Sequence, residues 1–494
     1  MKKIRINLIA SIVYQIVAII YGFVLPKLIL ENFGSEVNGL LQSVTQFLGV
    51  IGFLDMGVGQ VVRSALYKPL EDGDSDQVSR IMATGGRFYR KIAYALLGYV
   101  AILLVVHPIL VSDSFNFGFV ATMIAIMAVG SFVQYYFGVI QEQLLHAHQK
   151  SYLIYASHTF CYLLTMAVCV CMIKSDCSVH AVKLATCLIF LVKPFFCVWY
   201  VRRKYRVDWR MECETDPLPQ KRHGVAQHIS GVVLDGTDNI VLTLFSTLSN
   251  VSIYSVYFMI VNSLNTLYQS AAVAIQSAAG QVWARQDEKD IRRVFSVAEL
   301  CLHKVTVFLF CCAGLLIVPF VKVYTAGVTD VDYIQPLFAL LLVLAYGIRC
   351  LRTPYNIWIL AAGHFKQSQR CHITAALLNL VISIALVFRF GLIGIAIGTL
   401  TAMCYQTAWM MLYVTKKLIK CGCGCVIKQM ASDALSALLI YLVAGRIGLQ
   451  DVTYGGWIVM ALKTSFIAML CIAFVSILFY PKQIRQFIAK TVKK

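Results

Sequence analysis

About fourteen apolar runs, each close to 20 residues long, constrain what this 494-residue chain can fold into. A helix needs about 20 apolar residues to cross the roughly 30 Å hydrocarbon core of a bilayer. Inside that core each segment must satisfy its own backbone hydrogen bonds, which favours helices. The pattern therefore predicts an all-α polytopic membrane protein with about 14 transmembrane helices. The predicted spans are 6–30, 39–62, 89–111, 118–140, 152–173, 180–200, 226–246, 252–276, 297–320, 333–353 (with a continuation to about 362), 371–388, 391–414, 431–449 and 457–480.

Composition and loop lengths exclude several other classes of protein. The chain is 59% hydrophobic and only 14% charged, whereas soluble domains are about 45–50% apolar and about 25% charged. The predicted outer loops are too short for an outer catalytic domain. The cytoplasmic loops are too short for an ATPase domain, and no phosphate-binding G-x-x-x-x-G-K-[ST] motif occurs. We therefore expect neither an enzyme nor a bound cofactor or metal.

The basic charge follows the predicted topology. The chain carries 43 Lys and Arg against 24 Asp and Glu, for a net charge of +19. If the N-terminus is cytoplasmic, most of the basic residues lie in cytoplasmic loops, for example in 63–91, 202–222 and 285–304. This positive-inside bias predicts a bacterial cytoplasmic (inner) membrane protein with both termini in the cytoplasm. The charge therefore does not indicate a nucleic-acid partner.

The sequence contains an internal duplication. Ala147-His148-Gln149-Lys150 follows one apolar run, and Gly363-His364-Phe365-Lys366 follows another 216 residues later. Gly59-Gln60-Val61 and Asp76 have counterparts at nearly the same spacing, at Gly280-Gln281-Val282 and Asp290. Duplicated membrane bundles are typical of transporters that bind their substrate between two halves.

The duplication predicts the domain organisation. Six spans per copy is an even number, so both copies start on the same side of the membrane and form a parallel repeat. We expect an N-terminal six-helix lobe over 1–200, a polar cytoplasmic linker over 201–224, and a second six-helix lobe over 225–415. Residues 416–494 then hold two extra helices and a basic cytoplasmic tail.

Two carboxylates within one predicted span are candidates for function, because a charge at the bilayer centre costs on the order of 3 kcal/mol. Asp235 and Asp238 are three residues apart, on one helix face, and Asn239 lies beside them. They could bind a coupling cation such as H⁺ or Na⁺, or meet the hydroxyls of a sugar. The alternative is a polar clamp between helices.

Cations within other spans predict an anion path. Arg349 and Arg352 are also three residues apart, and arginine suits phosphate through paired hydrogen bonds. Lys27 follows Pro26 and Lys193 precedes Pro194, so each lysine lies at a helix kink. The alternative for the arginines and for Lys27 is that long side chains reach the interface; for Lys193 it is an ordinary kink.

Span two carries a polar stripe that includes Gln46 and Asp55. Asp55 begins the string Asp55-Met56-Gly57-Val58-Gly59, and Arg63 follows it. With this string, the Phe33–Gly39 turn, Asp238–Leu242 and the repeated His-x-Lys motif, the whole chain resembles the Wzx-type polysaccharide flippases. These belong to the multidrug/oligosaccharidyl-lipid/polysaccharide (MOP) exporter superfamily.

The resemblance implies a function. The expected substrate is an undecaprenyl-diphosphate-linked oligosaccharide, moved by alternating access to the outer leaflet for surface polysaccharide such as O-antigen or capsule. Cationic cavity residues, here Lys27, Arg63, Lys193, Arg349 and Arg352, would meet the diphosphate, while the tail stays among membrane lipid. Glycosyltransferases and a polysaccharide polymerase would act in the same pathway.

Three alternatives stay open at this point. A cation-exporting multidrug antiporter would have the same fold, but its cavity would be acidic and aromatic rather than basic. A lipid-II flippase lies close to the leading hypothesis. A membrane-embedded glycosyltransferase or polymerase fits poorly with the short outer loops and with the absence of an acidic catalytic cluster.

Overall fold

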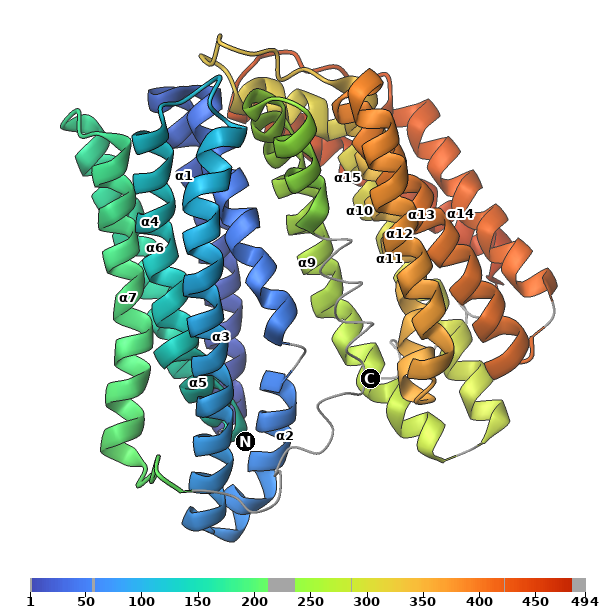
Figure 1. The fold of residues 1–494 in the computed structure, drawn as a ribbon. Coiled ribbons are helices and arrows are strands. Elements are labelled where there is room, and N and C mark those ends of the chain that lie inside the picture. Colours follow the sequence, from blue (N-terminus) through green and yellow to red (C-terminus); the bar gives the residue numbers. More distant parts are fainter. Residues whose placement is uncertain (1, 56–57, 212–235, 286, 422, 482–494) are drawn as a thin grey trace. The chain divides into compact units, whose positions relative to one another are not determined.

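We describe a computed structural model of the chain, which covers residues 2–55, 58–211, 236–285, 287–421 and 423–481. Throughout these ranges the regular elements are helices, so the predicted all-α fold is confirmed. Helix contacts divide the chain into two compact units, Met1–Ser252 and Ile253–Lys494. Each unit is an assembly of long helices, and Figure 1 shows them in chain order from blue to red.

The first unit is built from α1 to α7 and from a helical segment over 236–245. Its helices α1, α4, α6 and α7 pack side by side, and α3 packs on α4. The elements are α1 (Lys2–Gly49), the short 3₁₀ segment η1 (Val50–Asp55), α2 (Val58–Asp72), α3 (Ser75–Leu110), α4 (Phe117–Val133), the π-helical turn η2 (Gln134–Gly138), α5 (Val139–Ala147), α6 (Ser151–Lys174) and α7 (Val179–Lys204).

The second unit contains most of α9 and every later helix. Helices α11, α12 and α13 pack together, and the hairpin of α14 and α15 packs on α10. The elements are α9 (Leu248–Ala284), α10 (Glu288–Tyr324), α11 (Pro336–Ala361), α12 (Phe365–Phe390), α13 (Leu392–Tyr413), the π-helical turn η3 (Val414–Leu418), α14 (Cys423–Ala444) and α15 (Tyr454–Phe479).

The helices match the predicted membrane spans. Within the described ranges, eleven helices are long and apolar enough to cross a membrane. The first of these, Arg5–Asp55, holds the first predicted span and most of the second, with a kink between them at Gly34, where φ is 83°. The eighth predicted span is α9, and the seventh is described only from residue 236 onward. The chain is therefore a multi-pass membrane protein.

The second predicted span, 39–62, differs from the structure. Its helix ends at Gly49 and continues as η1 to Asp55, and α2 begins at Val58 as a separate amphipathic helix. Since α2 buries Val58, Val62 and Leu66 and exposes polar residues on its other face, its apolar residues form a stripe, not a continuous surface. Apolar content alone could not distinguish this stripe from a span.

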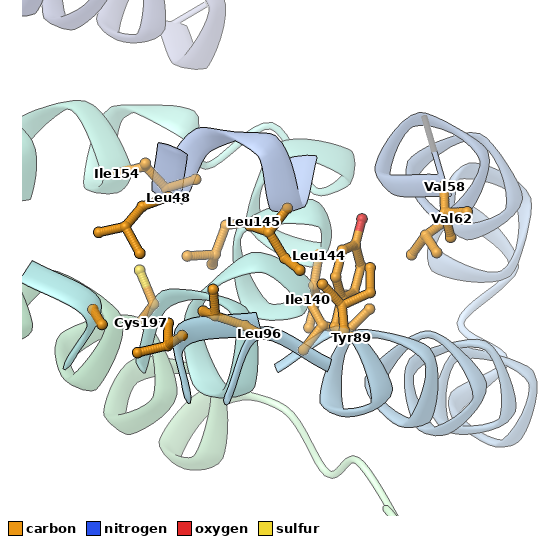
Figure 2. Packing of buried hydrophobic residues seen from close by; sticks show 14 of the residues in the cluster. Leu48, Val58, Val62, Tyr89, Leu96, Ile140, Leu144, Leu145, Ile154 and Cys197 are labelled. Carbon is orange, nitrogen blue, oxygen red and sulfur yellow. The ribbon is translucent and has the colours of Figure 1, made fainter. Parts of the chain in front are cut away.

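The core of the first unit lies where α3, α5 and α2 meet. Figure 2 shows Val58 and Val62 of α2 facing Tyr89, Ile140 and Leu144 across this core. Fully buried side chains continue it along α3 toward α7, through Leu96 and Cys197. A separate cluster in the second unit joins α10 to the α14–α15 hairpin.

The duplicated motifs occupy equivalent positions in the two units. The ring of His148 packs edge-on against Tyr205, just after the end of α7, with centroids 5.5 Å apart. In the second unit His364 Nδ1 lies 2.9 Å from the Tyr413 hydroxyl, at the end of α13. Each repeated His therefore joins the loop after the fourth helix of a copy to the end of its sixth helix.

Two further features accompany the repeated motif. Lys150 lies over the rings of Tyr205 and Tyr200, at 4.9 and 5.4 Å. Burial lowers the pKa of Lys150, but contacts with the two tyrosine hydroxyls outweigh it and leave that pKa above its usual value. The long helices α3 and α10 also begin alike, because Asp74 and Asp287 accept hydrogen bonds from backbone N–H groups of their first turns.

Candidate functional site

A cavity of about 560 Å³ in the first unit has several polar side chains in a largely apolar wall. Its wall is formed by the end of α1, by η1, by the last part of α4 with η2 and the start of α5, by the first half of α6, and by the middle of α7. Two of its lining residues, Lys193 and Asp55, are among the site residues predicted from sequence. The lining residues are Thr45, Leu48, Gly49, Ile51, Asp55, Met127, Gly130, Ser131, Gln134, Tyr135, Val139, His158, Phe190, Lys193 and Pro194.

Lys193 is held in this wall by two partners. Its ammonium group donates to Glu142 Oε1 at 2.7 Å and to His158 Nε2 at 2.9 Å, and its side chain is only 8% exposed. Pro194 follows it within α7 and removes the backbone hydrogen bond to the carbonyl of Phe190. The lysine at the predicted kink therefore belongs to a buried ion pair and lines a cavity.

The π-helical turn η2 helps to place the partner of Lys193. Gln134 and Glu142 are eight residues apart, which in a regular α-helix puts them roughly 80° apart around the axis. The extra residue in the π turn brings them to within roughly 20° of one face. Gln134 Nε2 accordingly donates to Glu142 Oε1 at 3.0 Å. Such turns are found frequently at functional sites.

The network determines which nitrogen of His158 carries a proton. An ammonium group has no acceptor, so His158 Nε2 must accept from Lys193 and a neutral ring carries its proton on Nδ1. Within the described part of the chain, His158 Nδ1 is buried without a hydrogen-bond partner. Sequence reasoning did not select Glu142, His158 or Gln134.

Asp55 and Arg63 lie near the same wall. Asp55 Oδ1 accepts a hydrogen bond of 2.7 Å from the Tyr89 hydroxyl. Arg63 donates through Nε and Nη2 to Gln143 Oε1, at 3.0 and 2.9 Å. Arg63 does not line the cavity, and its guanidinium instead ties α2 to α5.

The remaining predicted residues of the first unit lie apart from this cavity. Lys27 forms an ion pair with Glu31 at 3.2 Å, within α1. Gln46 is half-buried, while Asp238 and Asn239 are buried. The side-chain oxygen of Asn239 has no hydrogen-bond partner among the described residues. Asp235 lies outside the described residues.

A second buried polar chain connects α1, α3 and segment 236–245. Ser43 Oγ lies 2.8 Å from His107 Nε2 and accepts from Thr243 Oγ1 at 2.9 Å. These contacts tie the described end of the seventh predicted span to α1 and α3.

In the second unit, Arg349 and Arg352 are half-buried on α11. The Arg349 guanidinium lies 5.6 Å from the centroid of the Tyr346 ring. On neighbouring α10, Glu299 accepts from the Tyr355 hydroxyl at 2.6 Å. Arg349 therefore has an aromatic neighbour on its own helix.

Asp433 of α14 accepts hydrogen bonds from three side chains. Sequence reasoning did not select Asp433 either. It accepts from His303 Nδ1 at 2.7 Å, from Lys304 Nζ at 2.9 Å and from Gln429 Nε2 at 3.1 Å. His303 and Asp433 also line a cavity of about 450 Å³ whose other lining residues are mostly apolar. In the described ranges no group of three or more His, Cys, Asp or Glu side chains could hold a metal ion.

The fold is like those of two kinds of membrane transport protein of known structure. It is similar to a structure of the lipid II flippase MurJ in an inward closed conformation, with a TM-score of 0.71 and 14% identity. That match covers 97% of this chain and 99% of the flippase chain. No family model and no curated protein sequence matches the chain.

Multidrug transporters of the MATE family are also similar. An inward-facing structure has a TM-score of 0.66 at 13% identity and covers 80% of this chain and 94% of that chain. An outward-facing structure has a TM-score of 0.55 at 13% identity and covers 84% of this chain and 95% of that chain. At these identities the likeness defines the fold alone.

Proposed function

We propose that this protein is a flippase for undecaprenyl-diphosphate-linked oligosaccharides. It would move them by alternating access from the cytoplasmic to the outer leaflet of the bacterial inner membrane, for surface polysaccharide synthesis. Both termini would lie in the cytoplasm. The glycosyltransferases that build the glycan and the polymerase that extends it would be its pathway partners.

The observation that carries this proposal is the extent of the fold match. The match with the flippase covers 97% of this chain, whereas those with the two MATE structures cover 80% and 84%. The difference is about the size of residues 416–494, which include α14 and α15. Because the likeness to the flippase extends over nearly the whole chain, it favours a lipid-linked substrate over a small drug.

Polar and charged side chains of the helices support the same proposal. Arg349 and Arg352 of α11 would meet the diphosphate, because a guanidinium can pair with phosphate through two hydrogen bonds. Asp238 and Asn239 are buried, so they stay candidates for binding a coupling ion such as H⁺ or Na⁺.

Deleting the gene in its host tests the proposal. Lipid-linked glycan intermediates are extracted from the deletion strain, and surface polysaccharide is measured in parallel. We expect undecaprenyl-diphosphate oligosaccharide to accumulate while surface glycan is lost. Normal surface glycan with altered sensitivity to cationic dyes would instead identify a multidrug antiporter.

A lipid-II flippase is the second candidate, because the fold match with MurJ spans both chains almost completely. Expression of this chain in cells depleted of their own lipid-II flippase separates the two. Restored cell-wall synthesis would favour this second candidate, and continued lysis would favour the surface-glycan flippase.

A further inference from the structure

We propose that the first-unit cavity around Lys193 binds sugar residues of the transported glycan rather than its diphosphate. This inference rests on the proposed flippase function and assigns one part of the substrate to one site. It is carried by the pairing of the charges, by the polar groups of the wall and by the aromatic side chains beside it.

The charges of the cavity disfavour a diphosphate. Among the described lining residues, the acidic and basic side chains other than His158 are Asp55 and Lys193, and Glu142 pairs with the lysine at 2.7 Å. The cavity and the side chain paired with it therefore hold one ammonium group and two carboxylates. A diphosphate at Lys193 would compete with Glu142 and share the cavity with Asp55, and like charges at short range repel each other. A neutral ligand meets neither obstacle.

The polar groups of the wall suit hydroxyl groups. Each sugar hydroxyl both donates and accepts a hydrogen bond, so it needs a wall that offers both. Lys193 and the Gln134 amide donate, Asp55 accepts, and three hydroxyls can do either. A ligand that left these groups unpaired would incur their desolvation penalty. The hydroxyl-bearing lining residues are Thr45, Ser131 and Tyr135.

Aromatic rings lie next to these polar groups. Phe190 lines the cavity and packs edge-on against Tyr162, with centroids 5.6 Å apart. Tyr162 in turn stacks on Tyr21 at 4.5 Å and on Tyr14 at 5.9 Å. The face of an aromatic ring is electronegative and attracts the slightly positive C–H groups of a sugar ring. The stacked tyrosines of α1 and α6 fix the position of Phe190.

The size of the cavity limits what it can hold. Small-molecule sites are typically about 300–1,000 Å³, and this cavity has about 560 Å³. It has room for a small part of a glycan but not for a complete lipid-linked molecule. The remainder of the substrate must therefore lie outside it.

Binding of two lipids to the full-length protein in lipid nanodiscs tests the assignment. The probes are undecaprenyl diphosphate and the lipid-linked oligosaccharide extracted from the deletion strain. We expect the wild-type protein to bind the glycosylated lipid at least about tenfold more tightly, equivalent to about 1.4 kcal/mol. Two variants change the cavity. Ser131→Phe fills it. The double variant Lys193→Met with Glu142→Gln removes the ion pair and leaves neither member as an unpaired charge. Each should lose the preference and keep the affinity for bare undecaprenyl diphosphate.

The control is Lys183→Met, which removes another lysine of α7 that does not line the cavity. It should keep the wild-type preference. The inference is overturned if both cavity variants, folded by gel filtration, retain the preference, or if they weaken both lipids equally. A wild-type protein that binds both lipids equally also overturns it but leaves the flippase proposal standing. Binding of neither lipid overturns the proposed function itself.

Discussion

Lys193 and Glu142 are buried together, so each depends on the other for its stability. Their side chains are 8% and 15% exposed, and the atoms that pair are 2.7 Å apart. Removing one member of a buried ion pair leaves the other charge without compensation, which typically destabilises a protein by about 3–5 kcal/mol. Replacing both with neutral residues often costs far less.

We therefore predict that Lys193→Met and Glu142→Gln each lower the free energy of unfolding by about 3 kcal/mol. The double variant should lie closer to the wild type than either single variant. Unfolding of the purified protein in mixed micelles, followed by circular dichroism, measures this double-mutant cycle. Strictly additive losses would show that the two charges do not interact in the membrane-inserted protein.

Arg349 and Arg352 carry a prediction about transport rather than stability. If they meet the diphosphate, replacing both with Ala should abolish glycan export while the protein still folds and inserts. Surface glycan in a complemented deletion strain measures export, and gel filtration of the tagged protein measures folding. Full export by a well-folded double variant would mean that both side chains only reach for the membrane interface.

Among the elements, α1 makes a close approach that a single methyl group would disturb. A Cβ added at Gly39 would overlap the backbone carbonyl of Leu248, at the start of α9, whereas one added at Gly22 of the same helix meets nothing within 4 Å. A backbone atom cannot move aside as a side-chain end can. Packing against Leu248, and not helix geometry, therefore requires a glycine at position 39.

We predict that Gly39→Ala lowers the free energy of unfolding by about 1–3 kcal/mol, as overpacking usually does. Gly22→Ala is the matched control, and it should be neutral or stabilising by up to about 1 kcal/mol because alanine favours helix. Thermal unfolding of the two purified variants makes the comparison. Equal behaviour would mean that α1 and α9 do not approach each other at this point.

Among the polar contacts that join the α14–α15 hairpin to α10, those of Asp433 carry the charge. Its carboxylate accepts from His303, Lys304 and Gln429, and Gln429 is in turn bonded by the Tyr480 hydroxyl at 2.6 Å. We predict that Asp433→Ala destabilises the protein by about 3–5 kcal/mol, because the buried ammonium of Lys304 loses its counter-charge.

Hydrogen exchange localises this effect. Faster exchange in Val426–Ala444 is expected for Asp433→Ala, with little change in the first unit. Lys463→Arg, which keeps the charge at an exposed position of α15, is the control and should stay within about 0.5 kcal/mol of the wild type. Uniform loosening of every helix would contradict a local role for Asp433.

The sequence predicts the elements better than it predicts the site. Apolar runs and the repeat are properties of whole segments, so the spans and the all-α fold follow from them. Lys193 could also be selected, since it is a charge within an apolar run. Glu142 could not, because the predicted span ends at 140 and the helix continues through a π turn to Ala147. No pattern in a single sequence predicts the π-helical turn η2.

Asp433 and His303 were not selected from the sequence either, but for a different reason. Both lie inside predicted spans, so the rule that ionisable groups within a membrane are candidates for function would have found them. Their partnership was beyond prediction, since His303 and Asp433 are 130 residues apart. The partners of Arg63 and Asp55, Gln143 and Tyr89, are distant in sequence for the same reason.

At the scale of the whole molecule, the two units share a repeated motif but have different interiors. Each copy joins its repeated His to a tyrosine after its sixth helix, His148 to Tyr205 and His364 to Tyr413. The first unit nevertheless holds a cavity with Lys193, Asp55 and other polar side chains in its wall, and the cavity of the second unit is more apolar. This asymmetry suits a substrate whose parts differ in chemistry, as a lipid-linked glycan does.

Reconstituted translocation tests the central claim most directly. The purified protein is placed in liposomes that contain the lipid-linked oligosaccharide from the deletion strain, and a membrane-impermeant lectin reports the glycan on the outer leaflet. With the wild-type protein, we predict that the lectin-accessible fraction of the glycan rises from about half toward completion after the lectin is added. With the double variant Arg349→Ala and Arg352→Ala, we predict that this fraction stays at about half. An accessible fraction that stays at half, from a protein that exports cationic dyes in the same liposomes, would contradict the account.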